Sequence, residues 1–268
     1  SALSETWNGT NWTETNDLNT ARRGISGAGV NNTEALGFGG ISSPPSNAVG
    51  DTENWNGTNW TEVNNMNTAR ALGAGGGVVT AALTYGGTGD PPGYANTEEW
   101  NGTNWTEVAD LNTAVYYTTG DGTTASAIQA GGVVNPGPVV GTSEEWTATT
   151  LAGAWSTGGS INDGRSIMGA AGTGNSTGLI FGGSPTPTAN TESYNGTNWT
   201  EVNNLTTARH GLAGAGTATA ALAFGGSPTP NSALTETWNG TSWTEVNDLN
   251  DGRNSLAGTG TNTAALAT

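Results

Sequence analysis

The chain has 268 residues, 22 Asp and Glu against six Arg, and neither Lys nor Cys, so its formal net charge at pH 7 is −16. This charge disfavours nucleic acid and anionic lipid as partners, and the lack of Cys excludes disulfides, thiol catalysis and thiolate metal sites. No apolar run approaches the roughly 20 residues of a membrane span, and no charged-then-apolar leader opens the sequence, so we expect no membrane insertion. With 44 Gly and 33% hydrophobic residues, the composition favours short strands and tight turns over helices.

The first predicted element is a hairpin whose turn contains Asn8-Gly9, with Trp7 before the turn and Trp12 after it. Asn-Gly tolerates positive φ at both centres of a type I′ turn. If Asn8-Gly9 forms the two-residue loop, Trp12 faces Glu5, and if Gly9 and the next residue form it, Trp12 faces Trp7. Both registers place the two indoles on one face. We expect the rings to pack between neighbouring sheets, and a ring of sugar-stacking platforms is the alternative.

After this hairpin, each repeat predicts two inner strands. A Gly-rich segment that opens with Arg, residues 22–29 in the first repeat, leads into an apolar run that ends in Gly39-Gly40. Small residues suit the crowded centre of a ring, where bulky side chains would overpack. A variable loop follows. The loops 41–50, 88–95, 133–141, 184–190 and 227–233 all join the second strand to the third and should therefore emerge on one face.

The hairpin recurs along the whole chain, and its copies at 53–62 and 98–107 are nearly identical. Its first aromatic residue returns every 44 to 48 residues, the length of a four-stranded propeller blade. The six positions are Trp7, Trp55, Trp100, Trp146, Tyr194 and Trp238. We therefore predict an all-β fold, a six-bladed β-propeller of four-stranded antiparallel blades. It should form one domain over residues 1–268, with repeats starting near 1, 49, 94, 140, 188 and 232.

The order of apolar strand, Gly-Gly, loop, paired aromatics and Arg resembles the kelch family of β-propellers, and the resemblance covers essentially the whole chain. Five Gly pairs lie in phase with the hairpins, at Gly39-Gly40, Gly86-Gly87, Gly131-Gly132, Gly182-Gly183 and Gly225-Gly226. The chain departs from the family pattern because Trp stands where the first aromatic is commonly Tyr, except at Tyr194, and because the spacing to the second aromatic is shorter. The resemblance implies a closed propeller.

One sector breaks the repeat. Val115-Tyr116-Tyr117 replaces the Arg that opens the other inner segments, Trp146 and Trp155 lie nine residues apart, and Thr157 stands in place of an outer Glu. These residues belong to adjacent repeats. Tyr116, Tyr117 and Trp155 are therefore candidates for lining a unique pocket, and drift in a degenerate blade is the alternative interpretation.

The two ends of the sequence are complementary halves of one repeat. Residues 1–7 copy residues 232–238, and residues 263–267 copy residues 219–223. The N-terminal outer hairpin should therefore pair with the C-terminal inner strands to complete the sixth blade, which would hide both sheet edges.

Arginine also follows the repeat, at Arg22, Arg70, Arg165, Arg209 and Arg253. A ring of Arg near the central channel would be able to bind an anionic sugar or carboxylate. The alternative is bonding of each Arg to Glu or carbonyl groups between blades. We favour this structural role, because catalytic sites break symmetry whereas structural bonds repeat with it.

Few residues point to catalysis. His210 is the sole His, and no Ser, His and acid constellation can be assembled. Kelch-like oxidases resembling galactose oxidase hold copper through His and Tyr, with a Tyr–Cys crosslink, and none of this maps here. Turns such as Asp121-Gly122 and Asn16-Asp17 keep calcium open as a ligand without a full set of ligand positions. We expect no other cofactor and no enzymatic activity.

Function is therefore expected to reside in a surface. The acidic, Cys-free, Thr/Asn/Gly-rich repeats are similar to those of phage and environmental bacterial surface proteins. This similarity implies a structural or adhesive module on a virion or cell exterior that contacts a protein partner, or itself, through the loop face. A carbohydrate-binding lectin is the second hypothesis, and a glycan-processing enzyme on the same scaffold is the third. Asn-Gly-Thr and Asn-Trp-Thr sequons in the hairpins offer sites for glycosylation in a suitable host.

Overall fold

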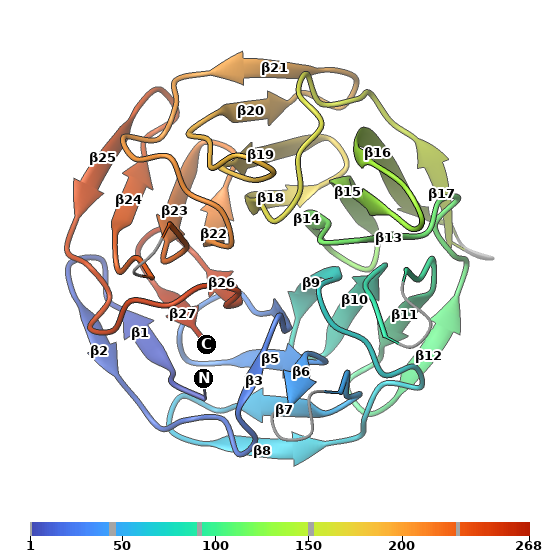
Figure 1. The fold of residues 1–268 in the computed structure, drawn as a ribbon. Coiled ribbons are helices and arrows are strands. Elements are labelled where there is room, and N and C mark those ends of the chain that lie inside the picture. The colour runs from blue at the N-terminus through green and yellow to red at the C-terminus, as the bar shows by residue number, and fades with distance from the viewer. Residues whose placement is uncertain (1, 43–46, 90–92, 150–152, 229–230) are drawn as a thin grey trace.

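The computed structural model describes residues 2–42, 47–89, 93–149, 153–228 and 231–268, and these residues form 27 strands and no helix. Six sheets of four or five strands surround a central axis, each with one edge at the axis and the other at the rim, and two further strands form a small separate sheet (Figure 1). The predicted six-bladed β-propeller is confirmed.

Four blades run in chain order from the axis to the rim. Blade 1 contains β4 (Ser26–Ala28), β5 (Ala35–Phe38), β7 (Thr52–Trp55) and β8 (Trp60–Val63). Blade 2 contains β9 (Ala74–Val78), β10 (Ala81–Tyr85), β11 (Thr97–Trp100) and β12 (Trp105–Val108). Blade 4 contains β18 (Gly169–Gly174), β19 (Thr177–Phe181), β20 (Thr191–Tyr194) and β21 (Trp199–Val202). Blade 5 contains β22 (Ala213–Thr217), β23 (Ala220–Phe224), β24 (Thr235–Trp238) and β25 (Trp243–Val246).

Blade 6 joins the two ends of the chain, as the sequence predicted. Its strands, from axis to rim, are β26 (Gly258–Gly260), β27 (Ala265–Ala267), β1 (Glu5–Trp7) and β2 (Trp12–Glu14). The register pairs Thr6 with Leu266, and the N- and C-termini lie side by side (Figure 1). The blade therefore closes the ring and leaves no unpaired strand edge at the junction.

Blade 3 is built differently from the others. It contains β14 (Thr119–Gly122), β15 (Ser126–Val134), β16 (Val139–Ala148) and β17 (Gly153–Thr157), and β13 (Val115–Tyr116) pairs with the far end of β15. The predicted loop 133–141 is therefore mostly strand, because a register shift after Ala130 lets β15 and β16 continue their ladder. In blade 1, a shorter pair, β3 (Arg22–Arg23) with β6 (Ile41–Ser42), lies in the equivalent place.

The Trp hairpins adopt the second of the two registers considered, with Trp7 opposite Trp12. Gly9 has a φ of +92°, whereas Asn8 and Thr10 do not have positive φ, so the predicted type I′ turn is wrong. Asn8 precedes the two central residues, and its Oδ1 accepts the N–H groups of Thr10 and Asn11 at 2.9 Å each. The Asn side chain thus closes the turn locally.

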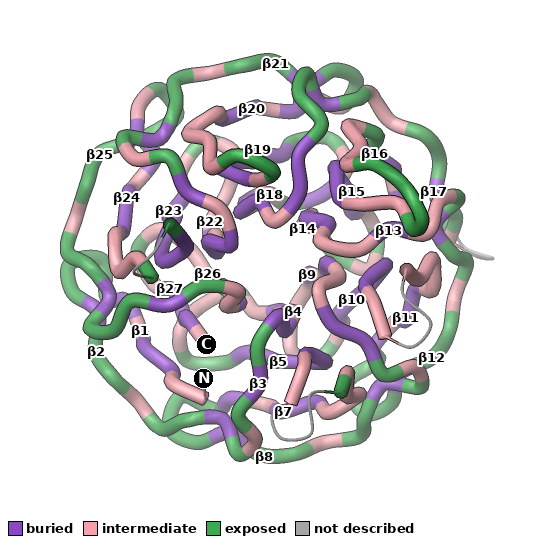
Figure 2. The backbone as a smooth tube through the Cα atoms, viewed as in Figure 1, coloured by how far each residue is buried: buried purple, intermediate pink, exposed green. Residues whose placement is uncertain are grey.

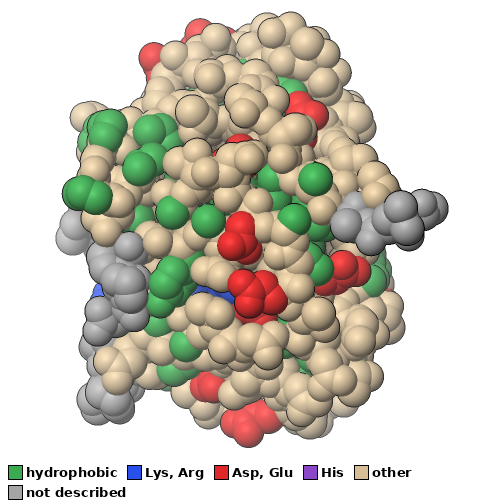
Figure 3. Space-filling view, turned by 90° about the vertical axis from the view of Figure 1, so that its right-hand side faces the viewer, with side chains coloured by type: hydrophobic (Ala, Val, Ile, Leu, Met, Phe, Trp, Pro, Cys, Tyr) green, Lys and Arg blue, Asp and Glu red, His purple; other side chains and the backbone are tan. Residues whose placement is uncertain are grey.

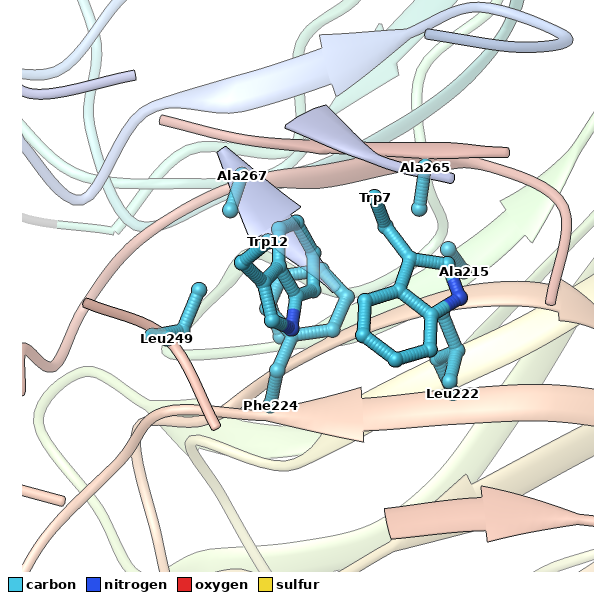
Figure 4. Packing of buried hydrophobic residues seen from close by; sticks show 9 residues of the cluster. Trp7, Trp12, Ala215, Leu222, Phe224, Leu249, Ala265 and Ala267 are labelled. Atoms are coloured by element: carbon cyan, nitrogen blue, oxygen red, sulfur yellow. The ribbon is translucent and has the colours of Figure 1, made fainter. Parts of the chain in front are cut away.

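The core lies between blades and consists largely of indoles. All 11 Trp are at most 6% exposed. Trp12 of blade 6 packs edge-on against Phe224 of blade 5 at a centroid distance of 4.9 Å, and its Nε1 donates to Thr235 Oγ1 at 3.0 Å (Figure 4). Each such ring contributes on the order of 4–6 kcal/mol of gross burial energy. The packing role predicted for the Trp residues is confirmed, while the outer strands remain mostly exposed (Figure 2).

The Gly-Gly pairs also join neighbouring blades. Gly39 and Gly40 have φ of +68° and +105°, and the N–H of Gly40 donates to the carbonyl of Arg70 in the next blade at 2.9 Å. A Cβ on Gly39 would lie 2.5 Å from the same oxygen. The same bond recurs at the other four pairs. Glycine is required here by both the positive φ and the close approach of the two backbones.

Candidate functional site

The five repeated Arg side chains form buried ion pairs with Glu on the third strand of a blade. The pairs Arg22–Glu53, Arg209–Glu236 and Arg253–Glu5 have N–O distances of 2.7, 2.8 and 2.6 Å, and Arg70–Glu98 and Arg165–Glu192 have the same arrangement. Each Arg precedes its inner strand rather than opening it, and none of the five lines the central channel. The alternative of an Arg ring at the channel is therefore wrong, and the favoured Arg–Glu bonding is present, although each Arg pairs with the Glu of the blade that it enters rather than with a neighbouring blade.

Each buried Glu also links its blade to the preceding linker. Glu53 Oε1 accepts from Arg22, while Glu53 Oε2 accepts from the backbone and side-chain nitrogens of Asn19 at 2.7 and 2.8 Å. Burial lowers the pKa of the Arg70, Arg165 and Arg209 guanidinium groups, an effect opposed by their Glu partners. Asn67, Asn112, Asn162 and Asn250 repeat the bond made by Asn19. These groups are occupied by the scaffold and are not available to a ligand.

Blade 3 keeps the buried Glu but lacks the Arg. Glu144 is 4% exposed, and it accepts three N–H groups, two from Asn112 and one from Thr113. The carbonyl of Gly131, which corresponds to one bound by Arg in the other blades, accepts instead from Gln129 Nε2 at 2.6 Å and from Thr118 Oγ1 at 3.1 Å. A neutral amide and a hydroxyl therefore replace part of the guanidinium.

The three candidate residues of the divergent sector lie in two different places. Trp155 is 6% exposed, packs edge-on against Tyr85 and donates to Thr97 Oγ1 at 3.0 Å, just as the second Trp of the other hairpins donates to a Ser or Thr hydroxyl of the preceding blade. It is a core residue and does not share a pocket with the other two. Tyr116 and Tyr117 are partly exposed on the loop face, with ring centroids 5.1 Å apart.

Tyr117 belongs to a closed ring of backbone hydrogen bonds at the loop-side mouth of the central channel. Its N–H donates to the carbonyl of Leu72 at 2.8 Å, and its carbonyl accepts from Ile167 at 2.9 Å. All six ring residues have φ between +53° and +65°, and each donates once and accepts once. In blade order they are Gly24, Leu72, Tyr117, Ile167, Gly211 and Ser255. The bulky side chains of this mouth therefore come from blades 2, 3 and 4.

Below this ring, the inner strands enclose a central cavity of about 370 Å³. Its wall consists mostly of Gly, Ala and Thr with larger apolar residues toward its two ends, and Asp121 of β14 is the one Asp, Glu, Arg or His side chain among the described residues that line it. The equivalent residues, by register against the second strand, are Ala28, Gly76, Ala171, Ala215 and Thr259. Asp121 therefore breaks the sixfold pattern inside the channel.

The Asp121 carboxylate is held at the wall between three blades. Its Oδ1 accepts the N–H of Gly122 at 2.6 Å, and its Oδ2 accepts the N–H of Gly172 in blade 4 at 3.0 Å. A Cβ on Gly76 of blade 2 would lie 2.9 Å from Oδ1. Burial raises the pKa of Asp121 to about 7, and the two backbone hydrogen bonds oppose this shift. The predicted Asp121-Gly122 turn is wrong, since both residues belong to strand β14.

Other polar groups offer less. Among the described residues, no three His, Asp or Glu side chains are grouped to hold a metal ion, and no helix is long and apolar enough to cross a bilayer. Two buried polar atoms lack a hydrogen-bond partner near the channel or its mouth: Nδ1 of His210, whose neighbour Gly211 belongs to the mouth ring, and Oγ1 of Thr259 in the channel wall.

Searches against known protein families and curated proteins find no match for this chain. The site is therefore defined by geometry alone. Sequence analysis selected Tyr117 from the missing Arg but missed Gln129 and the role of Asp121. One signal was present for Asp121: it is the single acid in the six Gly-rich inner segments.

Proposed function

We propose that this chain is a non-enzymatic, kelch-like propeller that serves as a structural or adhesive module and contacts a protein partner through its loop face. The main support for the proposal is that the repeated side chains are buried in the frame, whereas several unrepeated side chains are exposed. The repeated Trp, Arg and buried Glu side chains are occupied by the scaffold. The unrepeated side chains Leu72, Tyr116, Tyr117 and Ile167 are partly exposed together at one mouth.

This cluster, which we call the mouth patch, has the composition of a recognition surface. Aromatic residues on a rigid frame supply contact area at low entropic cost, and they are enriched at protein interfaces. The ring of backbone hydrogen bonds holds three of the four residues in place. The first residues of the connections between second and third strands lie beside the mouth, where Thr88, Ser184 and Ser227 pair with Ala71, Ser166 and His210. A partner would therefore meet a preformed apolar centre surrounded by variable loops.

Charge favours a cationic partner outside the cell or on a virion. Five of six Arg are buried in ion pairs, so Arg23 is the one exposed Lys or Arg. In a side view, acidic side chains spread over the outer wall and basic atoms are scarce (Figure 3). Such a surface attracts basic surfaces and repels other acidic ones.

A lectin function receives less support. Sugar stacking requires an accessible aromatic face, and all 11 Trp are packed between blades. A glycan-processing enzyme would need a pair of accessible carboxyls across a cleft. The channel offers Asp121 alone among the described residues. Selective, saturable binding on a glycan array would nevertheless replace the proposal with the lectin hypothesis, and turnover of a bound glycan would replace it with the enzyme.

The test is binding of the fluorescently labelled chain to intact virions or cells of its source. The double variant Leu72→Asn/Tyr116→Ala removes half of the mouth patch, and we expect it to weaken binding at least tenfold. The matched control is Val30→Asn/Val78→Asn at the opposite mouth, where Val30 is 46% exposed. Equal loss in both variants, or no loss in either, would overturn the assignment to the mouth patch.

A further inference from the structure

The central cavity has a polarity that the scaffold does not require. Five blades place Ala, Gly or Thr where blade 3 places Asp121, so a propeller of this type closes without a carboxyl at this position. The inner strands are sheet edges, which leaves backbone carbonyl and N–H groups directed toward the axis. The cavity volume of about 370 Å³ lies in the range of small-molecule sites.

We propose that the channel binds a small organic cation, an ammonium group on an elongated apolar body, with the ammonium group on Asp121 and the apolar body directed toward the mouth patch. This site shares Leu72, Tyr117 and Ile167 with the mouth patch, but it is defined by Asp121, which lies deeper in the channel and is not part of the partner surface. It uses the inside of the channel, whereas the partner would meet its outer face.

The chemistry of the wall selects a cation. Each oxygen of the Asp121 carboxylate accepts one backbone N–H, which leaves further lone pairs on both oxygens. Nothing else that lines the described cavity carries a charge that would neutralise it, and an anion would meet this carboxylate unopposed. One carboxylate among backbone carbonyls matches a protonated amine better than a divalent metal, which needs several anionic ligands.

The length of the channel selects the shape of the ligand. Asp121 lies four residues beyond Tyr117, and because Tyr117 has a φ of +53° and β14 starts at Thr119, the separation is at most about 13 Å, the value for a fully extended strand. The upper wall is apolar, with Leu72 and Ile167 on either side of Tyr117. A linear alkylammonium of six to eight carbons is shorter than this upper limit and fits between Asp121 and the mouth. Shorter amines would leave the apolar end of the channel unfilled.

Protonation of Asp121 sets the pH dependence of binding. The pKa near 7 means that the carboxylate charge is mostly absent at pH 6 and mostly present at pH 8. Strands β9, β15, β18 and β19, which pack against β14, present no charged side chain to it, and the neighbouring titratable group is the Tyr85 hydroxyl, which donates to Ile128 O at 2.9 Å. Burial and Asp121 both raise the pKa of Tyr85, so it stays neutral in this range.

The test is calorimetric titration of the whole chain with n-butyl-, n-hexyl- and n-octylammonium chloride at pH 8. We expect saturable binding that is tightest for the longer two, at least tenfold weaker for 1-hexanol, and about tenfold weaker at pH 6. The variant Asp121→Ala copies the residue found in blades 1, 4 and 5, so it is compatible with the fold. It should lose at least tenfold in affinity for n-hexylammonium.

The matched control is Glu62→Gln, which removes the same charge from the exposed outer strand β8. It should bind n-hexylammonium as the wild type does. The proposal is overturned if none of the three amines saturates at millimolar concentration, if Asp121→Ala binds them equally well, or if hexanoate competes with the same affinity. Circular dichroism and melting of each variant separate loss of the site from loss of the fold.

Discussion

In five blades the buried Glu of the third strand meets an Arg, whereas in blade 3 the equivalent Glu144 meets only three N–H groups of the preceding linker. Blade 3 nevertheless keeps its four strands and joins the ring. All six blades therefore share one requirement, a set of hydrogen-bond donors for the buried carboxylate. A cation satisfies this requirement, but amide and backbone donors also do so, because hydrogen bonds to the charged form stabilise it.

The same blade holds the features that distinguish the channel. Tyr116, Tyr117 and Asp121 all follow the missing Arg within seven residues. The regular blades hold their Arg, Glu and Trp residues in the frame, and blades 2 and 4 add Leu72 and Ile167 to the mouth. The divergent blade contributes three of the residues on which both proposals rest.

The largest expected effect is that of removing one Arg from a regular blade. Arg209→Val copies blade 3 and leaves Glu236 with one hydrogen-bond donor, the N–H of Thr206, so an uncompensated charge stays buried. We expect a loss of about 3–5 kcal/mol in the free energy of unfolding, measured by urea titration. The control is Arg23→Val at an exposed Arg, which should change the free energy of unfolding by less than about 0.5 kcal/mol.

The compensation seen in blade 3 sharpens this test. Adding Leu212→Thr and Ala223→Gln to Arg209→Val reproduces Thr118 and Gln129 at their equivalent positions in blade 5. Recovery of at least about 1 kcal/mol relative to Arg209→Val alone would support transferable compensation. If the triple variant is less stable still, the donors of blade 3 work only in their own context.

A second effect concerns pH. Folded Asp121 holds its proton to about pH 7, whereas an unfolded Asp releases it near 3.9, so the carboxyl weakens the fold as pH rises between these values. Asp121→Ala removes this dependence. Between pH 4 and pH 8 the free energy of unfolding of the wild type should fall by on the order of 2 kcal/mol more than that of the variant. Solvent in the channel makes this smaller than the pKa difference alone would give. Parallel pH profiles from urea unfolding would contradict the assignment, and Glu62→Gln serves as the control.

A smaller effect is expected at Gln129. Gln129→Ile copies the residue of blade 4 and removes both bonds of Nε2, to Thr118 Oγ1 and Gly131 O. We expect a loss of about 1–2 kcal/mol in unfolding free energy. Thr84→Val at the equivalent position of blade 2 removes a single bond, to Ala74 O, and should cost less. An equal cost at the two sites would mean that blade 3 does not depend on its substitute donor.

The smallest expected effects are changes in stability on replacing either of the two glycines of the mouth ring by Ala. Gly24 and Gly211 have φ of +63° and +65°, and Ala at either position costs about 1 kcal/mol for the left-handed conformation. At Gly24 the new methyl would also lie 2.5 Å from Leu72 Cδ2, whereas at Gly211 no contact falls below 3.5 Å. Thermal melts should therefore rank Gly24→Ala as the less stable variant. The difference should vanish in a Leu72→Ala background.

Sequence analysis predicted most of the frame because the frame repeats. Trp spacing predicted six blades, the matching ends predicted the closing blade, and the phase of Arg and Glu predicted their pairing. It failed at single positions whose conformation depends on a particular local or inter-blade contact. The turn register of Gly9 depends on an Asn8 side-chain bond, the strand character of 133–141 depends on a register shift after Ala130, and the place of Asp121 depends on Gly76 and Gly172. A residue that occurs in only one repeat has no counterpart in the others, so the repeat pattern does not predict which residues it contacts.

The ring of six left-handed residues at the mouth has a consequence for assembly as a whole. Each peptide unit turns by about 60° relative to the one before it, and the sixth donor finds the first acceptor. A ring of five or seven blades would need turns of about 72° or 51° and would leave these bonds stretched or crowded. Because the interfaces between neighbouring blades are closely similar, they do not by themselves determine the number of blades. The hydrogen-bond ring at the mouth fits six blades, so the gain or loss of one repeat by recombination would disrupt this ring first.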